Sequence, residues 1–193
     1  MDWSRRVLTL WFGDMASPPA DKVKSWFVKD PAFDRALSET FGELLVALSS
    51  GPMPAWAETP EGCLAAVIVL DQFSRNIHRG TPEMYATDVR ALGLVEEALA
   101  AGWGAQLPLS GRTFLYMPLM HSESVSDQER CVALFEGLLD EAGEEGLEQS
   151  VHYAREHRDI VKRFGRFPHR NAILGRASTP EEVRFLAEEH SGF

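Results

Sequence analysis

The sequence is poor in cysteine and in long apolar runs. Its two cysteines, Cys63 and Cys131, lie in apolar surroundings without a Cys-x-x-Cys pair, which favours buried reduced thiols over a disulfide framework or a zinc site. The longest apolar run, 63–70, is less than half of a membrane span, and no cleavage site follows the shorter run 7–12. We therefore expect a cytoplasmic protein that does not cross a membrane.

Positive charge is also scarce. The 193 residues include 19 lysines and arginines against 29 aspartates and glutamates, so the formal net charge is −10. Nucleic acids require a broad basic surface, which excludes general nucleic-acid binding. With 45% hydrophobic residues the chain has the composition of an ordinary globular protein, and its length favours a single domain over 1–193.

Strand-like alternation is absent, whereas signals for helix starts recur. The stretches Thr59-Pro60-Glu61, Thr81-Pro82-Glu83 and Thr179-Pro180-Glu181 each combine an N-cap residue, a proline and an acidic first turn. Apolar residues at helical spacing predict helices that form antiparallel pairs: 60–77 with 82–101, 108–121 with 127–142, and 144–164 with 179–190. The sequence therefore predicts an all-α fold of stacked antiparallel helix pairs, arranged as a TPR-like right-handed superhelix or as an irregular helical bundle.

One segment reverses the acidic character of the chain. Between His152 and Arg176 seven basic residues face two acidic ones, so this segment carries +5 while the rest of the chain sums to −15. Three of the six histidines lie in the same segment. Such a concentration of cationic side chains predicts a place where an anion, a carboxylate or an acidic partner binds.

A first polar cluster continues the buried helix that starts at residue 60. Asp71 and Arg75 are spaced i,i+4 with the acid first, and they follow the apolar stripe rather than the outer face. Asn76 and Arg79 come directly after them. This arrangement indicates either an internal ion pair that ties two helices together or an Asp71 that holds Arg75 toward a ligand.

A second cluster ends the helix predicted over 108–121. Pro118 should kink this helix, and His121 falls on its inward face. His121 is either a satisfied core residue or part of a site. Glu123 can orient His121 only if the helix has already ended, because residues two apart on a helix point in different directions.

A third cluster lies in the basic segment. His157 falls on an apolar stripe of its helix, and a glycine helix stop precedes a turn that mixes aromatic, proline and donor residues. A rigid backbone there would aim several donors at one point. The candidate ligand-binding residues of this cluster are His157, Arg158, Arg166, His169, Arg170 and Asn171.

These clusters resemble one known family. The stretches DQFSRNIHRG (71–80), FLYMPLMHSES (114–124) and HRDIVKRFGRFPHRNAILGR (157–176), followed by STPEE, resemble an uncharacterised bacterial family catalogued as domain of unknown function 924. The start VLTLWFG (7–13) is similar to the usual start of that family. The resemblance covers nearly the whole chain and implies a TPR-like superhelix, but no activity. Ser74 stands where the family is expected to have proline.

Our leading functional prediction joins the three clusters in one inward pocket that binds an anionic small molecule or a carboxylate. Arg75, Arg166 and Arg170 would clamp the anion, because buried charges must be paired internally or offered to a ligand. Asn76 and Asn171 would orient it, and the histidines at 121, 157 and 169 would donate hydrogen bonds or carry protons.

Three other functions stay open at the level of the sequence. The chain could be a TPR-like adaptor for an acidic peptide, or a hydrolase with a histidine general base. The clusters could also form one internal ion-pair network that only fixes the fold. The sequence has no complete metal-ligand set, so we expect neither a metal nor a cofactor.

Overall fold

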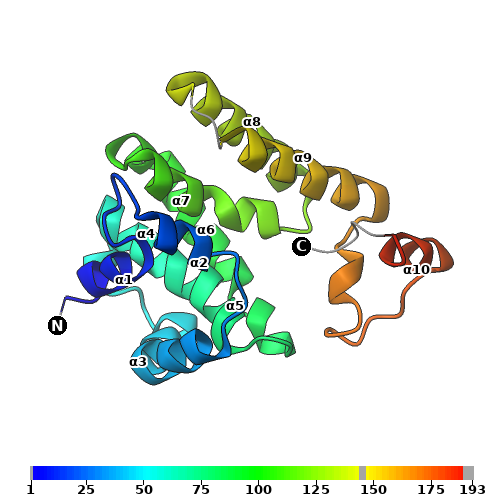
Figure 1. Ribbon diagram of the computed structural model, residues 1–193, viewed down its shortest axis with the longest axis horizontal. Coiled ribbons are helices and arrows are strands. Elements are labelled where there is room, and N and C mark those ends of the chain that lie inside the picture. The colour runs from blue at the N-terminus through cyan, green and yellow to red at the C-terminus, as the bar shows by residue number, and fades with distance from the viewer. Residues whose placement is uncertain (1, 144–146, 189–193) are drawn as a thin grey trace. The chain divides into compact units, whose positions relative to one another are not determined.

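The computed structural model describes residues 2–143 and 147–188, and in these ranges helices alternate with short connections and no strand occurs (Figure 1). This confirms the predicted all-α fold. By its internal contacts the chain divides into two compact units. The first unit comprises residues 1–79 and 83–118, and the second comprises 80–82 and 119–193. The single domain and the superhelical stacking stay predictions.

The first unit contains most of the helices. Two of them begin at capping side chains: Asp30 accepts hydrogen bonds from Ala32 N and Phe33 N, and Thr59, one of the predicted signals, accepts one from Gly62 N. The elements are α1 (Trp3–Phe12), α2 (Ala20–Ser25), α3 (Pro31–Ser50), α4 (Pro60–Ile68), α5 (Ser74–Ile77), α6 (Asp88–Ala100) and α7 (Leu109–His121), whose last three residues belong to the second unit.

Helix α4 is the centre of the first unit. Every residue from Gly62 to Ile68 is buried, and the helix packs against α1 and α6 (Figure 1). An aromatic cluster lies beside it. The rings of Trp11 and Phe73 are 5.7 Å apart, and Phe114 meets Trp11 edge-on at 5.4 Å. Buried aromatic side chains contribute strongly to stability because each removes a large apolar area from water. The core of this unit is therefore mainly apolar.

The chain is helical from residue 60 to residue 77, as predicted, but the helix is not of the α type throughout. A π-helical turn, Val69–Phe73, separates α4 from α5, and Ser74 N–H closes it onto Val69 O. The hydroxyl of Thr87 donates to Leu70 O, so a side chain engages a carbonyl of the helix at this point. A proline at position 74 has no N–H and could not make the closing bond. The serine therefore supplies a hydrogen bond of the π turn.

The helix predicted over 82–101 begins later than expected. The Thr81-Pro82-Glu83 signal leads only to a 3-10 turn, Pro82–Tyr85, and α6 starts at Asp88. Two side chains tie this turn to the preceding segment, because Ser74 Oγ donates to Glu83 O in addition to the bond from Thr87. These tertiary hydrogen bonds compete with helix continuation, which the local signal does not encode.

The second unit is built on a helical hairpin of α8 (Val125–Ala142) and α9 (Leu147–Phe164), which form the most extensive helix contact of the chain (Figure 1). Glu136 of α8 pairs with Arg155 of α9. Glu129, seven residues earlier on α8, pairs with Lys162, seven residues later on α9. The helices are therefore antiparallel. A 3-10 turn, η5 (Pro168–Arg170), and α10 (Pro180–Leu186) complete the unit.

The helix predicted over 144–164 was expected to pair with the helix predicted over 179–190. This prediction is wrong, because the main partner of α9 is α8. The apolar stripe of α9 packs against α8, whereas α10 has only seven residues and lies against η5 and the end of α9. There the rings of Phe164 and Phe185 are 5.0 Å apart. A helix this short cannot cover a partner of eighteen residues. Residues 144–146 and 189–190 of the predicted pair lie outside the described residues.

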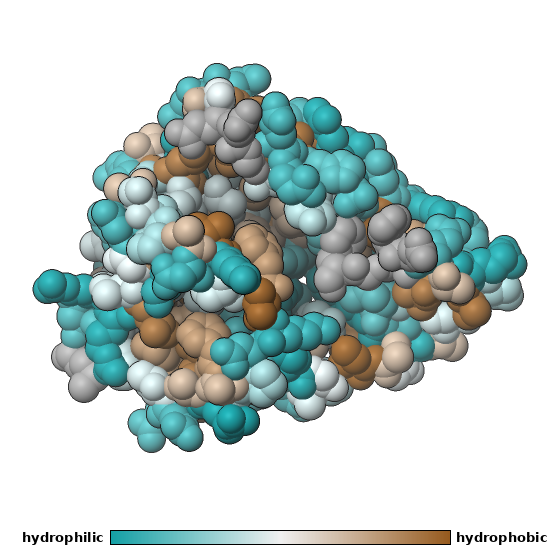
Figure 2. All heavy atoms as spheres, viewed as in Figure 1, coloured by the Kyte–Doolittle hydropathy of each residue, from teal (hydrophilic) through white to brown (hydrophobic). Residues whose placement is uncertain are grey.

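The surface is mostly hydrophilic on the face drawn in Figure 2, where hydrophobic residues reach solvent in small groups between polar ones. Two consecutive apolar residues after α2, Phe27 and Val28, have 74% and 51% of their surface exposed. Single exposed apolar side chains are normal on soluble domains and carry no function by themselves.

Candidate functional site

The first predicted cluster forms an ion pair inside the first unit. Arg75 Nη1 lies 2.8 Å from Asp71 Oδ1, and the same guanidinium bonds both carboxylate oxygens of Asp88 at 2.9 and 3.1 Å. Asp71 is 1% exposed. Burial lowers the pKa of Arg75, but the charges of the two carboxylates outweigh it and the pKa is raised. The predicted Asp71–Arg75 pair is therefore present, and Arg75 already holds two carboxylates of the chain.

The neighbours of this pair are engaged in similar ways. Arg79 makes a two-bond contact with Asp34 of α3, at 2.8 and 3.1 Å. Gln72 Nε2 donates to Asp71 Oδ2 at 2.7 Å. Asn76 is half-buried on α5. Arg75 thus joins the start of α6 to the π turn in a largely buried pair, and Arg79 joins the segment after α5 to α3 in a more exposed one.

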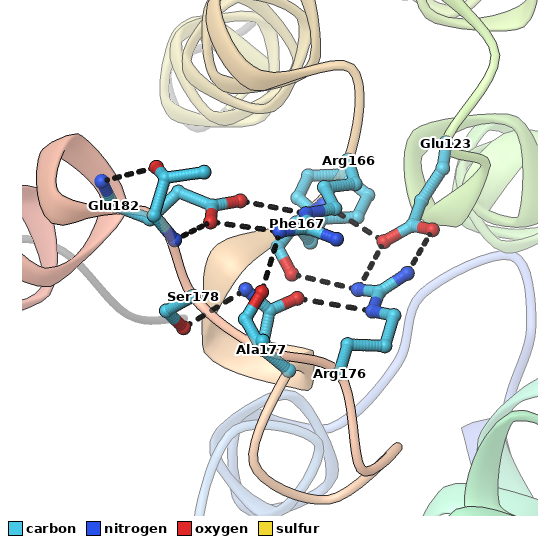
Figure 3. A network of polar contacts seen from close by, with 9 residues as sticks. Glu123, Arg166, Phe167, Arg176, Ala177, Ser178 and Glu182 are labelled. Carbon is cyan, nitrogen blue, oxygen red and sulfur yellow. Dashed lines mark hydrogen bonds and ion pairs between the residues drawn. The ribbon is translucent and has the colours of Figure 1, made fainter.

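In the second unit, Glu123 joins two predicted clusters (Figure 3). Helix α7 has ended at His121, so Glu123 is free of the helical geometry. Its carboxylate accepts Phe167 N–H at 2.8 Å and two guanidinium bonds from Arg176 at 2.7 and 2.9 Å. Burial raises the pKa of Glu123, but these hydrogen bonds outweigh it and the pKa is lowered. Glu123 is therefore a charged anchor for the turn around Phe167.

A second carboxylate fixes the other side of the same turn. Arg166 donates to both oxygens of Glu182, at 2.6 and 2.8 Å, and also to Ala177 O (Figure 3). Glu182 in turn accepts Thr179 N–H and forms the capping box of α10. The hydrogen bond from Arg166 is the main reason why the pKa of Glu182 is lowered. Arg166 thus holds α10 in place.

Asn171 connects these two anchors. Its Oδ1 accepts Arg176 Nε at 3.0 Å, and its Nδ2 donates to Ser178 Oγ at 3.0 Å. Arg176 Nη2 also donates to Phe167 O at 3.1 Å, which closes the segment 167–176 on itself. Asn171 is 1% exposed, so this polar network is largely internal. It matches the internal ion-pair alternative for this part of the third cluster.

The remaining predicted side chains gather around one ring. Phe167 is fully buried, and the guanidinium of Arg170 stacks over it at 4.6 Å. The imidazoles of His157 and His169 each lie 5.5 Å from the same ring, from α9 and η5. Arg170 Nη2 donates to His121 O at the end of α7, at 2.8 Å. Segments that are 49 positions apart in the sequence therefore meet here.

The electrostatics of this group differ from those of the ion pairs. The pKa of His157 is lowered from 6.5 to about 3, mainly by burial and further by the charges of its cationic neighbours. The pKa of His169 is lowered to about 4, by burial first and then by Arg170. Both imidazoles are therefore neutral near pH 7. The group combines one permanent positive charge with neutral ring nitrogens.

The structure distributes the twelve predicted residues unequally. Asp71, Arg75, Asn76 and Arg79 lie in the first unit, and the other eight lie in the second. Arg158 is on α9, where it pairs with its neighbour Asp159 rather than with the Phe167 group. The meeting of all three clusters in one pocket stays a prediction.

Three important residues were not among the predicted ones. Arg176 closes the basic segment and binds Glu123, and Glu182 had been interpreted only as part of a helix start. Gln128 of α8 is fully buried, and its Nε2 donates to Met120 O and Ser122 O, which fixes the end of α7. A buried glutamine in an apolar stripe could have been noticed, whereas nothing local in the sequence indicates which carboxylate binds which arginine.

Other features of the described ranges add little to the site. In residues 2–143 and 147–188 no group of three or more His, Cys, Asp and Glu side chains is placed to hold a metal ion. None of the helices described combines the length and apolar character of a bilayer crossing. A hollow of about 260 Å³ in the first unit is lined by Ser4, Leu8, Glu61 and their neighbours, and none of the twelve predicted residues lines it.

Comparison with known proteins identifies the same family that the sequence motifs resemble. The sequence model of a family described as "Bacterial protein of unknown function (DUF924)" matches residues 7–190. A solved structure of a protein of unknown function from Agrobacterium tumefaciens is similar over 95% of this chain and 96% of that chain, with 38% identity and a TM-score of 0.82. No curated protein matches the chain.

Proposed function

This chain belongs to the bacterial family DUF924, whose function is unknown, and we propose that its second unit binds a small oxyanion, a carboxylate or a phosphate, beside Arg170. The observation that carries the proposal is the convergence of Arg170, His157 and His169 on the ring of Phe167, where the same guanidinium of Arg170 also donates to His121 O. Hydrogen bonds from a guanidinium to an oxyanion are charge-assisted and strong.

The contrast with the other arginines narrows the proposal to this place. Arg75, Arg79 and Arg166 each make two hydrogen bonds to a carboxylate of the chain, so a ligand would have to break an existing pair to reach them. Arg170 lies instead among the predicted histidines: it donates to His121 O, its guanidinium stacks over the ring of Phe167, and its charge contributes to the lowered pKa of Glu123. Of the three predicted clamps, the proposal keeps Arg170 because of this position.

The histidines favour an anion for an electrostatic reason. Burial is the main reason why the pKa values of His157 and His169 are lowered, and the charge of Arg170 lowers both further, whereas Glu123 raises that of His169. An anion beside Arg170 would oppose the effect of the Arg170 charge and raise both pKa values. Binding at this site is thus favoured by the same charges that disfavour protonation of the rings.

Thermal and urea denaturation with inorganic phosphate, sulfate or succinate tests the proposal. A ligand that binds only the folded state stabilises it by RT ln(1 + [L]/Kd), about 2.7 kcal/mol at a hundred times Kd. We expect at least one of these anions to stabilise the wild type, and chloride at equal ionic strength to have little effect.

Two variants make the test specific. Arg170→Gln keeps an amide donor for His121 O but removes the positive charge. The increase in unfolding free energy that the anion causes should therefore be much smaller for this variant than for the wild type. Arg163→Gln is the matched control, because Arg163 is exposed on α9 and pairs with Glu181. No stabilisation of the wild type, or equal stabilisation of Arg170→Gln, would show that the cluster serves the fold alone.

A further inference from the structure

The hollow of the first unit is formed by residues that the proposed function does not use. It has a volume of about 260 Å³, and its lining comes from α1, from the segment after α1 and from the start of α4. Helices α1 and α4 pack against each other in this unit (Figure 1). Pockets for drug-sized molecules commonly measure about 300–1,000 Å³, so this hollow suits a smaller molecule.

Two exposed side chains of opposite charge line this hollow from different elements. Arg5 lies on α1, and Glu61 lies in the first turn of α4. Among the residues that the structure describes, the guanidinium of Arg5 and the carboxylate of Glu61 form no ion pair, either with each other or with a third group. A ligand in the hollow can therefore reach both charges without displacing a partner among these residues.

The hollow also has an apolar part and a fixed backbone around it. Leu8 of α1 and Met15 line it, and both are half-buried. Gly13 N–H donates to Thr9 O at 2.9 Å, and the hydroxyl of Ser110 donates to Met15 O. These bonds hold the segment after α1 in place. The hollow is thus formed before a ligand enters it, which reduces the entropy that binding costs.

We propose that this hollow binds a small zwitterion, of which a free α-amino acid with an apolar side chain is the simplest. Its carboxylate accepts hydrogen bonds from Arg5, its ammonium group donates to Glu61, and its side chain contacts Leu8 and Met15. A guanidinium has only donors and a carboxylate only acceptors, so the hollow selects a molecule with one group of each sign. This site in the first unit does not depend on the oxyanion binding proposed for the second.

Three probes with the same branched side chain test the proposal. Leucine carries both charges, leucinamide lacks the carboxylate, and isocaproate lacks the ammonium group. Each is titrated into the nitrogen-15-labelled full chain at about pH 6.5, and the backbone amide signals are followed by NMR. We expect leucine to shift the signals of residues 4–15 and 60–62 to saturation in the millimolar range. Leucinamide and isocaproate should each bind about fivefold more weakly or less, because each loses one charged contact at an exposed site.

Two variants assign each charge of the ligand to one residue. Glu61→Gln should bind leucine and isocaproate about equally, and Arg5→Gln should bind leucine and leucinamide about equally. Both residues are exposed, so the variants should fold as the wild type does, which circular dichroism checks. The matched controls Arg35→Gln and Glu39→Gln change exposed residues of α3 that do not line the hollow, and they should keep the affinities of the wild type.

Each outcome of these titrations decides the proposal. A wild-type chain whose amide signals do not respond to leucine, or respond only outside the hollow, would overturn it and leave the oxyanion test of the second unit unaffected. Equal binding of the three probes would mean that the hollow accepts the apolar side chain alone, which also overturns the selection of a zwitterion. A preference for leucine that loses one component in Glu61→Gln and the other in Arg5→Gln would support it.

Discussion

The two units reach their stability by different chemistry. The first unit is centred on α4, buried all round, and on an aromatic cluster that includes Trp11 and Phe73. The second unit holds more of the buried polar side chains: Gln128, His157, Arg170, Asn171 and Glu182, against Asp71, Ser74 and Thr87 in the first. Apolar packing is insensitive to pH, whereas polar networks depend on the protonation of each member. The second unit is therefore where pH and salt should act most strongly.

The positions of the tryptophans allow the two units to be followed separately. All five, Trp3, Trp11, Trp26, Trp56 and Trp103, lie in the first unit. Tryptophan fluorescence therefore reports on the first unit, and far-UV circular dichroism reports on the helices of both. A difference between the two signals identifies events in the second unit.

Acid should have the largest effect and should act through the second unit. The pKa of His157 is about 3 and that of His169 about 4 in the folded chain, below the ordinary 6.5. Between about pH 6.5 and pH 4 the unfolded chain therefore binds protons that the folded chain does not, and stability falls as pH drops. Over this range the loss should be on the order of several kcal/mol. Urea titrations at a series of pH values measure it.

A variant tests whether these imidazoles are responsible. His157→Leu should reduce the dependence on pH between about pH 6.5 and pH 4 by roughly half, because His169 remains in the variant. Below about pH 4.5 a further loss should remain, because the folded-state pKa values of Glu123 and Glu182 are lowered from 4.5. A wild type whose stability does not change from pH 7 to pH 5 would contradict the assignment.

Truncation of an aromatic residue should strike the first unit. Phe73 is fully buried, and its ring lies 5.1 Å from Phe41 and 5.7 Å from Trp11. Phe73→Ala should cost about 3–5 kcal/mol because it removes apolar contacts and leaves a cavity. Urea unfolding followed by tryptophan fluorescence measures this loss. Val89→Ala, at a position that is 84% exposed, should cost little, and a similar cost for both variants would show that the aromatic cluster does not support the unit.

Removal of one charge should loosen the second unit without creating a cavity. Glu123→Gln keeps the shape but weakens the bonds to Arg176 and Phe167 N–H, at a cost of about 1.5–3 kcal/mol. Circular dichroism should show the change more clearly than fluorescence. The matched variant Glu136→Gln breaks an exposed pair with Arg155 and should cost less than about 1 kcal/mol. Equal costs would mean that the Glu123 network is no stronger than a surface ion pair.

The smallest of these effects concerns the start of α10. Thr179→Ala removes the hydroxyl that accepts Glu182 N–H at 3.2 Å, and an N-cap of this kind contributes about 1 kcal/mol. Hydrogen exchange of residues 180–186 should accelerate, while α4 exchanges as before. Faster exchange in α4 as well would mean that the two units open together.

The fold was predictable where local chemistry decides it. The predicted capping residues Thr59 and Thr179 begin helices as their side chains indicate. The same Thr-Pro-Glu signal at position 81 gave only a 3-10 turn, because hydrogen bonds from Ser74 and Thr87 intervene. Such bonds join residues that are 9 and 17 positions apart, and helical periodicity carries no information about them.

The sequence indicated some of the polar residues that the structure brings together, but not how they pair. His121, His157 and Arg170 were noticed because polar residues cluster at the ends of apolar helices. The structure brings these three residues together. The partners of Arg75 beyond Asp71, and of Arg166, were not predictable. A carboxylate pairs with an arginine wherever the backbone allows, and sequence separations of 13 or 16 residues match no helical repeat.

The closed segment 167–176 has a consequence for proteolysis. Trypsin must draw an extended arginine side chain into its specificity pocket, and Arg166, Arg170 and Arg176 are each bonded to groups of the second unit. Trypsin should thus cut after these three arginines more slowly than after exposed basic residues such as Arg155 and Arg163. Once a cut appears after Arg176, the clasp with Glu123 has already opened, and the rate of that cut measures how often it does so.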